Sequence, residues 1–196
     1  MSGYHAVVLA AGAGSRFGGG KLAAALGDGT LLDAALRSAC ASPVAGVVVV
    51  TGAHRRAVEA IVADFASDAR TPLATVHCTD HAAGMAASLR FGLAALPADA
   101  AGAFIFLGDM PRIPEGIAQQ LLGALTGDVH ATAPVFGDRL GHPVLISRSL
   151  FAAFSGAGDG GGGRILRALG DALARVPVDD DGVLADVDTP ADLARL

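Results

Sequence analysis

The sequence predicts an α/β fold, in which a mostly parallel sheet lies between two layers of helices. Hydrophobic residues make up 52% of the 196 residues and charged residues 17%, which suits strands that are buried on both faces. Short apolar runs alternate with stretches of helical spacing, the pattern of βαβ units with right-handed crossovers. The only low-complexity run, residues 156–163, is too short for a linker, so we expect a single domain over residues 1–196.

The predicted strands are apolar runs of strand length bounded by turn residues. They cover His5–Leu9, Gly46–Thr51, Leu73–Cys78, Ala103–Leu107, Ala131–Phe136 and Pro143–Ile146. Because ligands bind outside the carboxyl ends of the strands in such open sheets, we expect the loops after Leu9, Cys78 and Leu107 to be near neighbours.

The predicted helices follow from apolar residues that recur at helical spacing. One such stripe lies in residues 54–65 and a second follows Pro114. Further helices are expected within GMAASLRFGL, from Gly84 to Leu93, after the glycines of residues 160–163, and from Pro190. Helices between parallel strands cover both faces of the sheet, which gives the three-layer α/β/α arrangement.

Composition excludes several classes of protein. The net charge is −5 and no basic run occurs, so we expect no nucleic-acid partner. Cys40 and Cys78 are too few and too far apart for a disulfide framework or a usual zinc site, which favours a reducing cytoplasmic location. The apolar stretch from Ala6 to Ala11 is broken by Gly12 and has no preceding Lys or Arg, so we expect no signal sequence and no membrane association.

A glycine-rich segment, LAAGAGSRFGGGKL from Leu9 to Leu22, follows the first predicted strand. Its glycines allow backbone N–H groups to approach phosphate oxygens closely. Arg16 offers a planar fork of donors, and Lys21, the only lysine of the chain, offers a mobile point charge. The segment therefore predicts a polyphosphate site, with an ordinary flexible surface loop as the alternative.

Two better-known glycine loops do not fit this segment. A Walker A loop would need glycine where Ser15 stands and serine or threonine where Leu22 stands. A dinucleotide-binding loop would need glycine in place of Phe17 and an acidic residue after the second strand, which ends at Thr51 and Gly52. The loop is therefore neither of these two kinds.

Two aspartates are candidate metal ligands. Asp109 directly follows a very apolar predicted strand, and Asp188 lies in DVDTPADL near the C-terminus. Mg²⁺ prefers one or two carboxylates together with substrate phosphates. The alternatives are a turn or helix cap at Asp109 and a helix cap at Asp188. Four further aspartates are interpreted as a solvated acidic turn: Asp179, Asp180, Asp181 and Asp186.

The glycine-rich segment resembles the LAAGxSxRMGxxKL signature of the MobA-like superfamily of molybdenum-cofactor nucleotidyltransferases, with Phe17 in place of the commoner methionine. LGDMPRI and VDTPADL resemble the D-x-P and [ND]-T-P-[ED]-[DE]-L motifs of this family. The resemblance implies a Rossmann-like nucleotidyltransferase fold with a mixed, mostly parallel sheet. It also implies that Arg16 and Lys21 bind an NTP triphosphate, and that Asp109 and Asp188 hold a bridging Mg²⁺.

The resemblance extends to the nucleoside. LAAG is similar to the cytidylyl-transferring branch, whereas guanylyl-transferring members have LAGG, so CTP is favoured over GTP. The segment GMAASLRFGL resembles the G-x-x-x-SL-x-x-GL element that lines the nucleotide site of cytidylyl-transferring members; an ordinary polar helix residue is the alternative for Ser88. The expected nucleotide-binding residues are Leu9, Ala10, Ala11, Gly12, Gly14, Ser15, Arg16, Lys21 and Ser88.

The acceptor side is expected in the C-terminal half. GHPVLISRSLF and GDGGGGR resemble the GHPVLF and GDxGAR segments of the family, although four glycines stand where the family has three residues. Expected acceptor-binding residues are His142, Gly160, Gly161 and Arg164. A mobile loop and a structural histidine are the alternatives. His5, His54, His77, His81 and His130 show no metal-ligand pairing and receive no role.

The implied reaction is attack by an acceptor phosphate oxygen on the α-phosphorus of CTP, with release of pyrophosphate. Arg16, Lys21 and Asp109 are the expected catalytic residues. The implied acceptor is a molybdopterin-type cofactor, and a molybdenum hydroxylase is a possible recipient of the product. Two alternatives remain: guanylyl or other nucleotidyl transfer to a different small phosphate or phosphosugar, and a noncatalytic protein that carries the cofactor.

Overall fold

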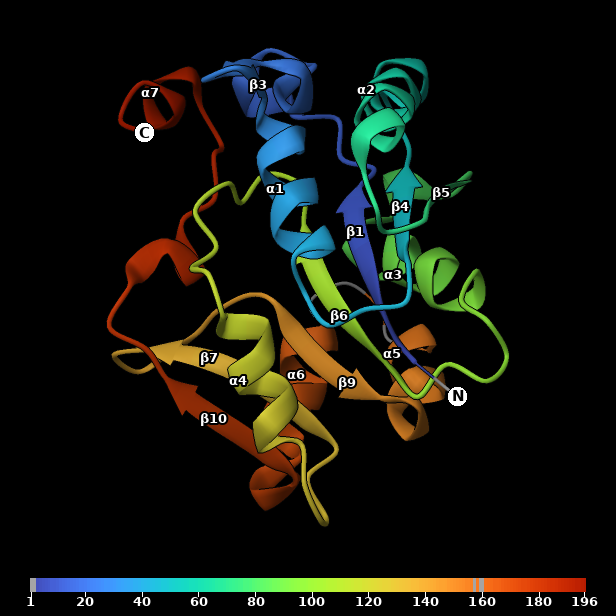
Figure 1. Ribbon diagram of the computed structural model, residues 1–196, viewed down its shortest axis with the longest axis vertical. Coiled ribbons are helices and arrows are strands. Elements are labelled where there is room, and N and C mark those ends of the chain that lie inside the picture. Colours follow the sequence, from blue (N-terminus) through green and yellow to red (C-terminus); the bar gives the residue numbers. More distant parts are fainter. Residues whose placement is uncertain (1–2, 157, 159–160) are drawn as a thin grey trace.

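A computed structural model describes residues 3–156, 158 and 161–196, and Figure 1 shows its central sheet and the helices around it. The strands follow the order β10-β7-β9-β6-β1-β4-β5, and β8 pairs with β7. Their bounds are β1 Tyr4–Ala10, β4 Val47–Thr51, β5 Leu73–His77, β6 Gly102–Leu107, β7 Ala131–Phe136, β8 Arg139–Leu140, β9 Val144–Ser147 and β10 Leu173–Pro177. A small hairpin, β2 Ala25–Leu26 and β3 Gly29–Thr30, lies apart from this sheet.

The sheet is mixed but mostly parallel, as predicted. Pairing is parallel along β6, β1, β4 and β5, and between β7 and β10. β9 is antiparallel to both of its neighbours, β6 and β7, and the short β8 is antiparallel to β7. The edge strand β10 was not predicted, because LARVP alternates apolar residues with arginine and proline and forms no apolar run.

Helices cover both faces of the sheet, which confirms the three-layer arrangement. α1 Leu31–Cys40, α2 Arg55–Asp68 and α4 Ile117–Ala124 pack on one face, and α3 Met85–Ala94, α5 Phe151–Ser155 and α6 Gly161–Ala168 pack on the other. The alternation of side chains along β1 produces the two cores: Ala6 and Val8 belong to the first, and Val7 to the second. α7, Pro190–Leu193, ends the chain.

Three helices differ from the sequence-based expectation, and one of them, the short α5, was not predicted. α1 was not predicted, although its start carries a capping box in which Thr30 Oγ1 accepts from the Asp33 N–H and Asp33 Oδ2 accepts from the Thr30 N–H. α6 begins at Gly161, so Gly162 and Gly163 form its first turn rather than a loop that leads into it. In the part of the chain that the structure describes, no helix is long and apolar enough to cross a membrane.

Strand register brings the predicted loops together. Leu9 pairs with Leu107 of β6, Ala10 pairs with Thr51 of β4, and Thr51 pairs in turn with His77 of β5. The predicted loops after β1, β5 and β6 therefore leave the same edge, together with the loop after β4. The C-terminal segment joins them because the Val187 N–H donates to the main-chain oxygen of Asp109 at 3.0 Å. Residues separated by almost the whole chain therefore meet at the carboxyl edge of the sheet.

Candidate active site

The glycine-rich segment forms a tight loop after β1. Gly14, Gly18, Gly19 and Gly20 have φ angles between +60° and +95°, a region that glycine adopts without the steric cost of a side chain. The N–H groups of Phe17 and Gly19 both donate to the carbonyl of Gly14 at 3.0 Å. The positions of the glycines thus follow from the backbone path of the loop.

The first half of this loop offers backbone donors to a ligand. Among the residues that the structure describes, no protein acceptor bonds the N–H groups of residues 12–16. Gly12, Gly14, Ser15 and Arg16 line a cavity of about 170 Å³, and Lys21, Asp109 and Asp188 line it as well. Unpaired N–H groups beside two cations are a typical binding site for phosphate oxygens.

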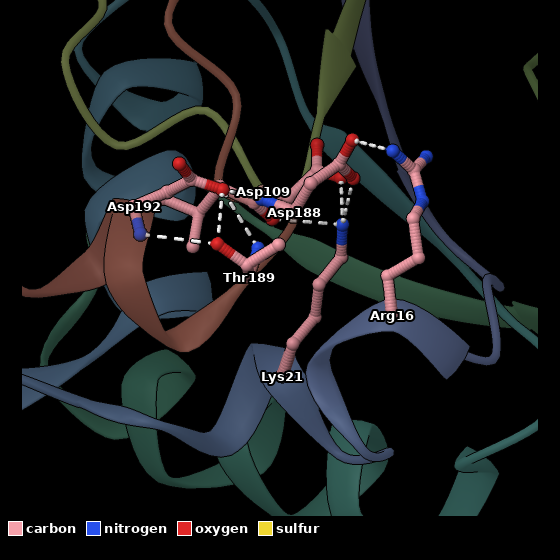
Figure 2. Close-up of polar contacts among 7 residues, drawn as sticks. Arg16, Lys21, Asp109, Asp188, Thr189 and Asp192 are labelled. Carbon is pink, nitrogen blue, oxygen red and sulfur yellow. Dashed lines mark hydrogen bonds and ion pairs between the residues drawn. The ribbon is translucent and has the colours of Figure 1, made fainter.

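Lys21 is the centre of the charged cluster in this cavity (Figure 2). Its Nζ lies 2.5 Å from Asp109 Oδ2, 2.9 Å from the carbonyl oxygen of Val187 and 3.4 Å from Asp188 Oδ1. Arg16 reaches the other oxygen of Asp188 at 2.6 Å. The Lys21 side chain is only 12% exposed, whereas that of Arg16 is 74% exposed, so Lys21 is held in place and Arg16 has room to move.

The two aspartates fit a hard cation that is shared with a substrate. Asp109 and Asp188 both approach the same ammonium group, so their carboxylates converge on one point. No cluster of three or more histidine, cysteine, aspartate or glutamate side chains suited to a metal occurs among the described residues. Two carboxylates completed by phosphate oxygens match the preference of Mg²⁺, whereas a zinc site would need more protein ligands.

The alternative that Asp188 caps the last helix does not hold in this structure. Thr189 is the N-cap residue of α7, and its side chain accepts from the Asp192 N–H. Hydrogen bonds from the Thr189 side chain and backbone hold the pKa of Asp192 below its usual value. Asp192 also accepts from the Asp188 N–H at 3.2 Å, so the capping box fixes the backbone that carries Asp188.

A second cavity, of about 350 Å³, adjoins the first and shares Gly12, Arg16 and both aspartates with it. Ser88, which is only 4% exposed, lies in its lining with Ala11. This cavity thus lies beside the cavity with the unpaired N–H groups and contains the residues predicted to contact the nucleoside.

Asp186 is solvent-exposed, as the sequence predicted, and it also lies in the lining of this second cavity, which the sequence did not indicate. Asp180 caps a turn by accepting from the Gly182 N–H, and Asp181 pairs with Arg112 on the surface. Asp186 differs from these two aspartates in its position. It lies two residues before Asp188, in the segment that the hydrogen bond from Val187 to Asp109 holds against the sheet edge. Its sequence surroundings, a run of aspartates, gave no sign of this difference.

The third cavity is the largest, at about 530 Å³, and shares Leu9 and Met85 with the second. Its lining is mostly apolar, with Leu89, Ile105, Leu140, Val144, Phe154 and Leu166. His142 is also in the lining, and burial lowers the pKa of this histidine, while the Ile105 carbonyl, Asp109 and Asp186 act in the opposite direction. Arg139, Arg167 and Arg175 add three positive charges.

The predicted acceptor residues have different positions in the structure. His142 lines the largest cavity, and so do Gly162 and Gly163, which follow Gly161 at the start of α6. Arg164 is exposed and is not among the residues that line this cavity, whereas Arg167 is. Gly160 lies outside the described residues. The acceptor roles of these residues stay predictions.

Sequence reasoning missed the three cavity arginines because Arg139, Arg167 and Arg175 come from separate elements and share no motif. It also gave no role to His54, although Nε2 of His54 contacts the glycine loop at two points. The TGAH turn after β4 carries this histidine, and only the pairing of β4 with β1 brings that turn to the loop.

Comparison with known proteins identifies the family and the fold. The profile of the MobA-like NTP transferase domain matches residues 6–176. The molybdenum cofactor cytidylyltransferase of Escherichia coli (strain K12) is 26% identical over 192 residues, which cover 98% of this chain and 94% of that protein. The crystal structure of Rv0371c from Mycobacterium tuberculosis H37Rv has a TM-score of 0.83 at 26% identity, with 99% and 97% of the two chains covered.

A manganese complex of Rv0371c from the same organism has a TM-score of 0.80 at 28% identity, and 99% of this chain and 97% of that chain are covered. A nucleotidyl transferase from Methanothermobacter thermautotroptrophicus has a TM-score of 0.78 at 22% identity over 100% and 96% of the two chains, and shares the fold. The glycine loop, the paired aspartates and these similarities lead to one conclusion: the chain belongs to the MobA-like NTP transferase family and is a nucleotidyltransferase.

Proposed function

We propose that this nucleotidyltransferase transfers CMP from CTP to the phosphate of a molybdopterin-type acceptor and releases pyrophosphate. The observation that carries the proposal is the cavity at the glycine loop, where unpaired N–H groups of residues 12–16, two cations and two converging carboxylates occur together. Phosphoryl chemistry needs positioning and charge neutralisation more than covalent catalysis, and these groups supply both.

The reaction forms a bond between an acceptor phosphate oxygen and the α-phosphorus of CTP, and breaks the bond from that phosphorus to the pyrophosphate oxygen. Backbone N–H groups of the glycine loop bind the triphosphate, while Lys21 and Arg16 neutralise charge that moves onto the leaving pyrophosphate. Lys21 is well suited to this because it is held near the loop, and Arg16 because its largely exposed side chain can exchange the surface ion pair with Asp188 for a phosphate oxygen.

Asp109 and Asp188 are the residues that would hold Mg²⁺, which when bound supplies further neutralisation of the triphosphate. The chemistry of two carboxylates with no third protein ligand among the described residues supports a cation shared with the nucleotide. The manganese complex of Rv0371c supports a divalent cation in a protein of the same fold. Asp109 has a second effect, because it positions Lys21.

The preference for CTP over GTP is supported by Ala11 in the LAAG sequence and by the name of the similar Escherichia coli protein. The preference for a molybdopterin-type acceptor is supported by the apolar walls and arginines of the largest cavity, because a fused ring with an anionic group fits such a lining better than a phosphosugar does. The cluster of Lys21 and Asp109 favours catalysis over a carrier role.

The test is pyrophosphate release by the full chain with molybdopterin and each of CTP, GTP, ATP and UTP, with Mg²⁺. We expect turnover with CTP to exceed turnover with GTP by at least about tenfold, which corresponds to about 1.4 kcal/mol of discrimination. Faster turnover with GTP would overturn the cytidylyl assignment. Binding of CTP without turnover would favour the carrier, and turnover only with a phosphosugar would overturn the acceptor.

A further inference from the structure

His54 joins the two ends of the glycine loop. Its Nε2 lies 2.9 Å from the carbonyl oxygen of Ala13 and 3.2 Å from the backbone nitrogen of Gly20. The histidine is itself anchored, because the adjacent Ala53 N–H donates to the carbonyl oxygen of Ala11 at 3.1 Å. The imidazole therefore lies within hydrogen-bonding distance of both ends of residues 13–20, and the turn that carries it is attached to the end of β1.

The contact at Ala13 sets the direction of a cavity-facing donor. In a trans peptide, the carbonyl of one residue and the N–H of the next point in opposite directions. Because the Ala13 carbonyl points to His54, the Gly14 N–H points away from His54. Gly14 lines the cavity with the unpaired donors. Glycine permits many backbone conformations, so this peptide needs an external contact to keep one orientation.

The two contacts of Nε2 require different protonation states of that nitrogen. An Nε2 that carries a proton donates to the Ala13 carbonyl, and an Nε2 without a proton accepts from the Gly20 N–H. One ring nitrogen cannot do both at once. Only the first state ties the Ala13 carbonyl and so fixes the Gly14 N–H.

We propose that His54 is a positioning residue for the triphosphate, which acts by holding the Ala13 carbonyl through its Nε2–H group. This inference rests on the proposed function in that the glycine loop is taken as the triphosphate site. His54 contacts the loop from the side of α2 and acts through the backbone. It adds preorganisation to a segment whose glycines would otherwise lose much conformational freedom on binding.

The test compares His54→Leu, which removes both hydrogen bonds, with His54→Gln, whose amide offers a donor and an acceptor. Calorimetry measures binding of inorganic tripolyphosphate and of CTP, each with Mg²⁺, to the full chain. We expect His54→Leu to weaken both ligands by the same factor, about tenfold, and His54→Gln to stay within about threefold of the wild type. His130→Leu, at an exposed histidine before β7, is the matched control.

A second measurement on the wild type does not depend on the stability of a variant. Long-range ¹⁵N–¹H spectra report whether Nε2 of His54 carries a proton, and we expect the protonated nitrogen when tripolyphosphate is bound. An unprotonated Nε2 in that complex would overturn the inference. Equal binding by His54→Leu and the wild type, or equal losses in the leucine and glutamine variants, would overturn it too. A wild type that binds neither tripolyphosphate nor CTP would overturn the proposed function together with the inference on His54. Failure of the inference alone leaves binding by the wild type intact, so the two failures can be told apart.

Discussion

The cavity at the glycine loop and the mostly apolar third cavity differ in the kinds of groups that line them. The cavity at the glycine loop is small and charged; most of its lining residues belong to one continuous segment, residues 9–22, which also supplies unpaired backbone N–H groups. The largest cavity is mostly apolar and is lined by side chains from β6, β8, β9, β10 and three helices. Phosphates are common to all NTPs and acceptors differ, so a backbone site suits the shared chemistry and a side-chain site suits the specific one.

This difference between the two cavities predicts which mutations should impair the reaction with every substrate and which should impair it with only one. Changes at the glycine loop should reduce reaction with every NTP and every acceptor, because they remove charge neutralisation common to all of them. Changes in the largest cavity should affect one substrate and leave the other almost unaltered. The predictions below test this division, and they begin with the largest expected effect.

Lys21→Met should lower kcat about 10²- to 10³-fold with any NTP, because it removes a held cation beside the expected triphosphate. Pyrophosphate release measures the effect. Arg55→Met is the matched control, since Arg55 pairs with Glu59 on the exposed face of α2. A kcat of Lys21→Met within threefold of the wild-type kcat would contradict the proposed role of the cavity at the glycine loop.

Asp109→Asn should weaken Mn²⁺ binding at least about tenfold. Mutation of a residue that merely hydrogen-bonds to a metal ligand lowers metal affinity by about tenfold or more, and loss of a ligand should cost no less. Electron paramagnetic resonance of free Mn²⁺ measures the affinity without need for turnover. Asp181→Asn is the control, since this aspartate pairs with Arg112 on the surface. Unchanged affinity in Asp109→Asn would contradict the assignment of the metal ligand.

Arg167→Met should raise the acceptor KM about 10- to 100-fold and leave the CTP KM within twofold, since a charge-assisted hydrogen bond of roughly 1.5–3 kcal/mol is lost only on the acceptor side. Initial rates at varied acceptor and fixed CTP test this. Arg164→Met separates the structure-based assignment from the motif-based one, because Arg164 belongs to the motif but does not line the cavity, whereas Arg167 does. A larger rise in the acceptor KM in Arg164→Met than in Arg167→Met would favour the motif-based assignment.

His142→Gln should reduce the pH dependence of stability. Burial lowers the pKa of His142 in the folded chain, whereas the unfolded chain keeps the usual value of about 6.5. The unfolded state therefore binds more protons as pH falls below that value, and the wild type loses stability there. The loss contributed by one group is at most about 1.4 kcal/mol per pH unit.

Urea unfolding at pH 7.5 and pH 5.5 measures the His142 effect. The difference in the free energy of unfolding between the two pH values should be smaller in His142→Gln than in the wild type. His130→Gln, at an exposed site, should retain the wild-type difference. An identical difference in all three proteins would show that His142 is not a buried neutral group, and would weaken the contrast between the two cavities.

Local patterns predicted most of the sheet because the central strands β1, β4 and β6 are largely buried on both faces and so read as apolar runs. The same reasoning missed α1, whose capping box at Thr30 and Asp33 was a usable signal, and β10, whose alternating sequence was not. The position of the glycine loop after β1 was predicted because its constraint is local: positive φ angles and backbone donors depend on consecutive residues.

The sequence by itself determined the family, the mostly parallel fold and the identity of the loop with Arg16 and Lys21, because these depend on short motifs and strand composition. Only the tertiary structure decided which groups meet around that loop. Asp186, His54 and Arg167 lie in separate segments, and strand pairing together with the bond from Val187 to Asp109 sets their distances to the site. Contacts between distant segments depend on the packing of the whole chain, and no local pattern records them.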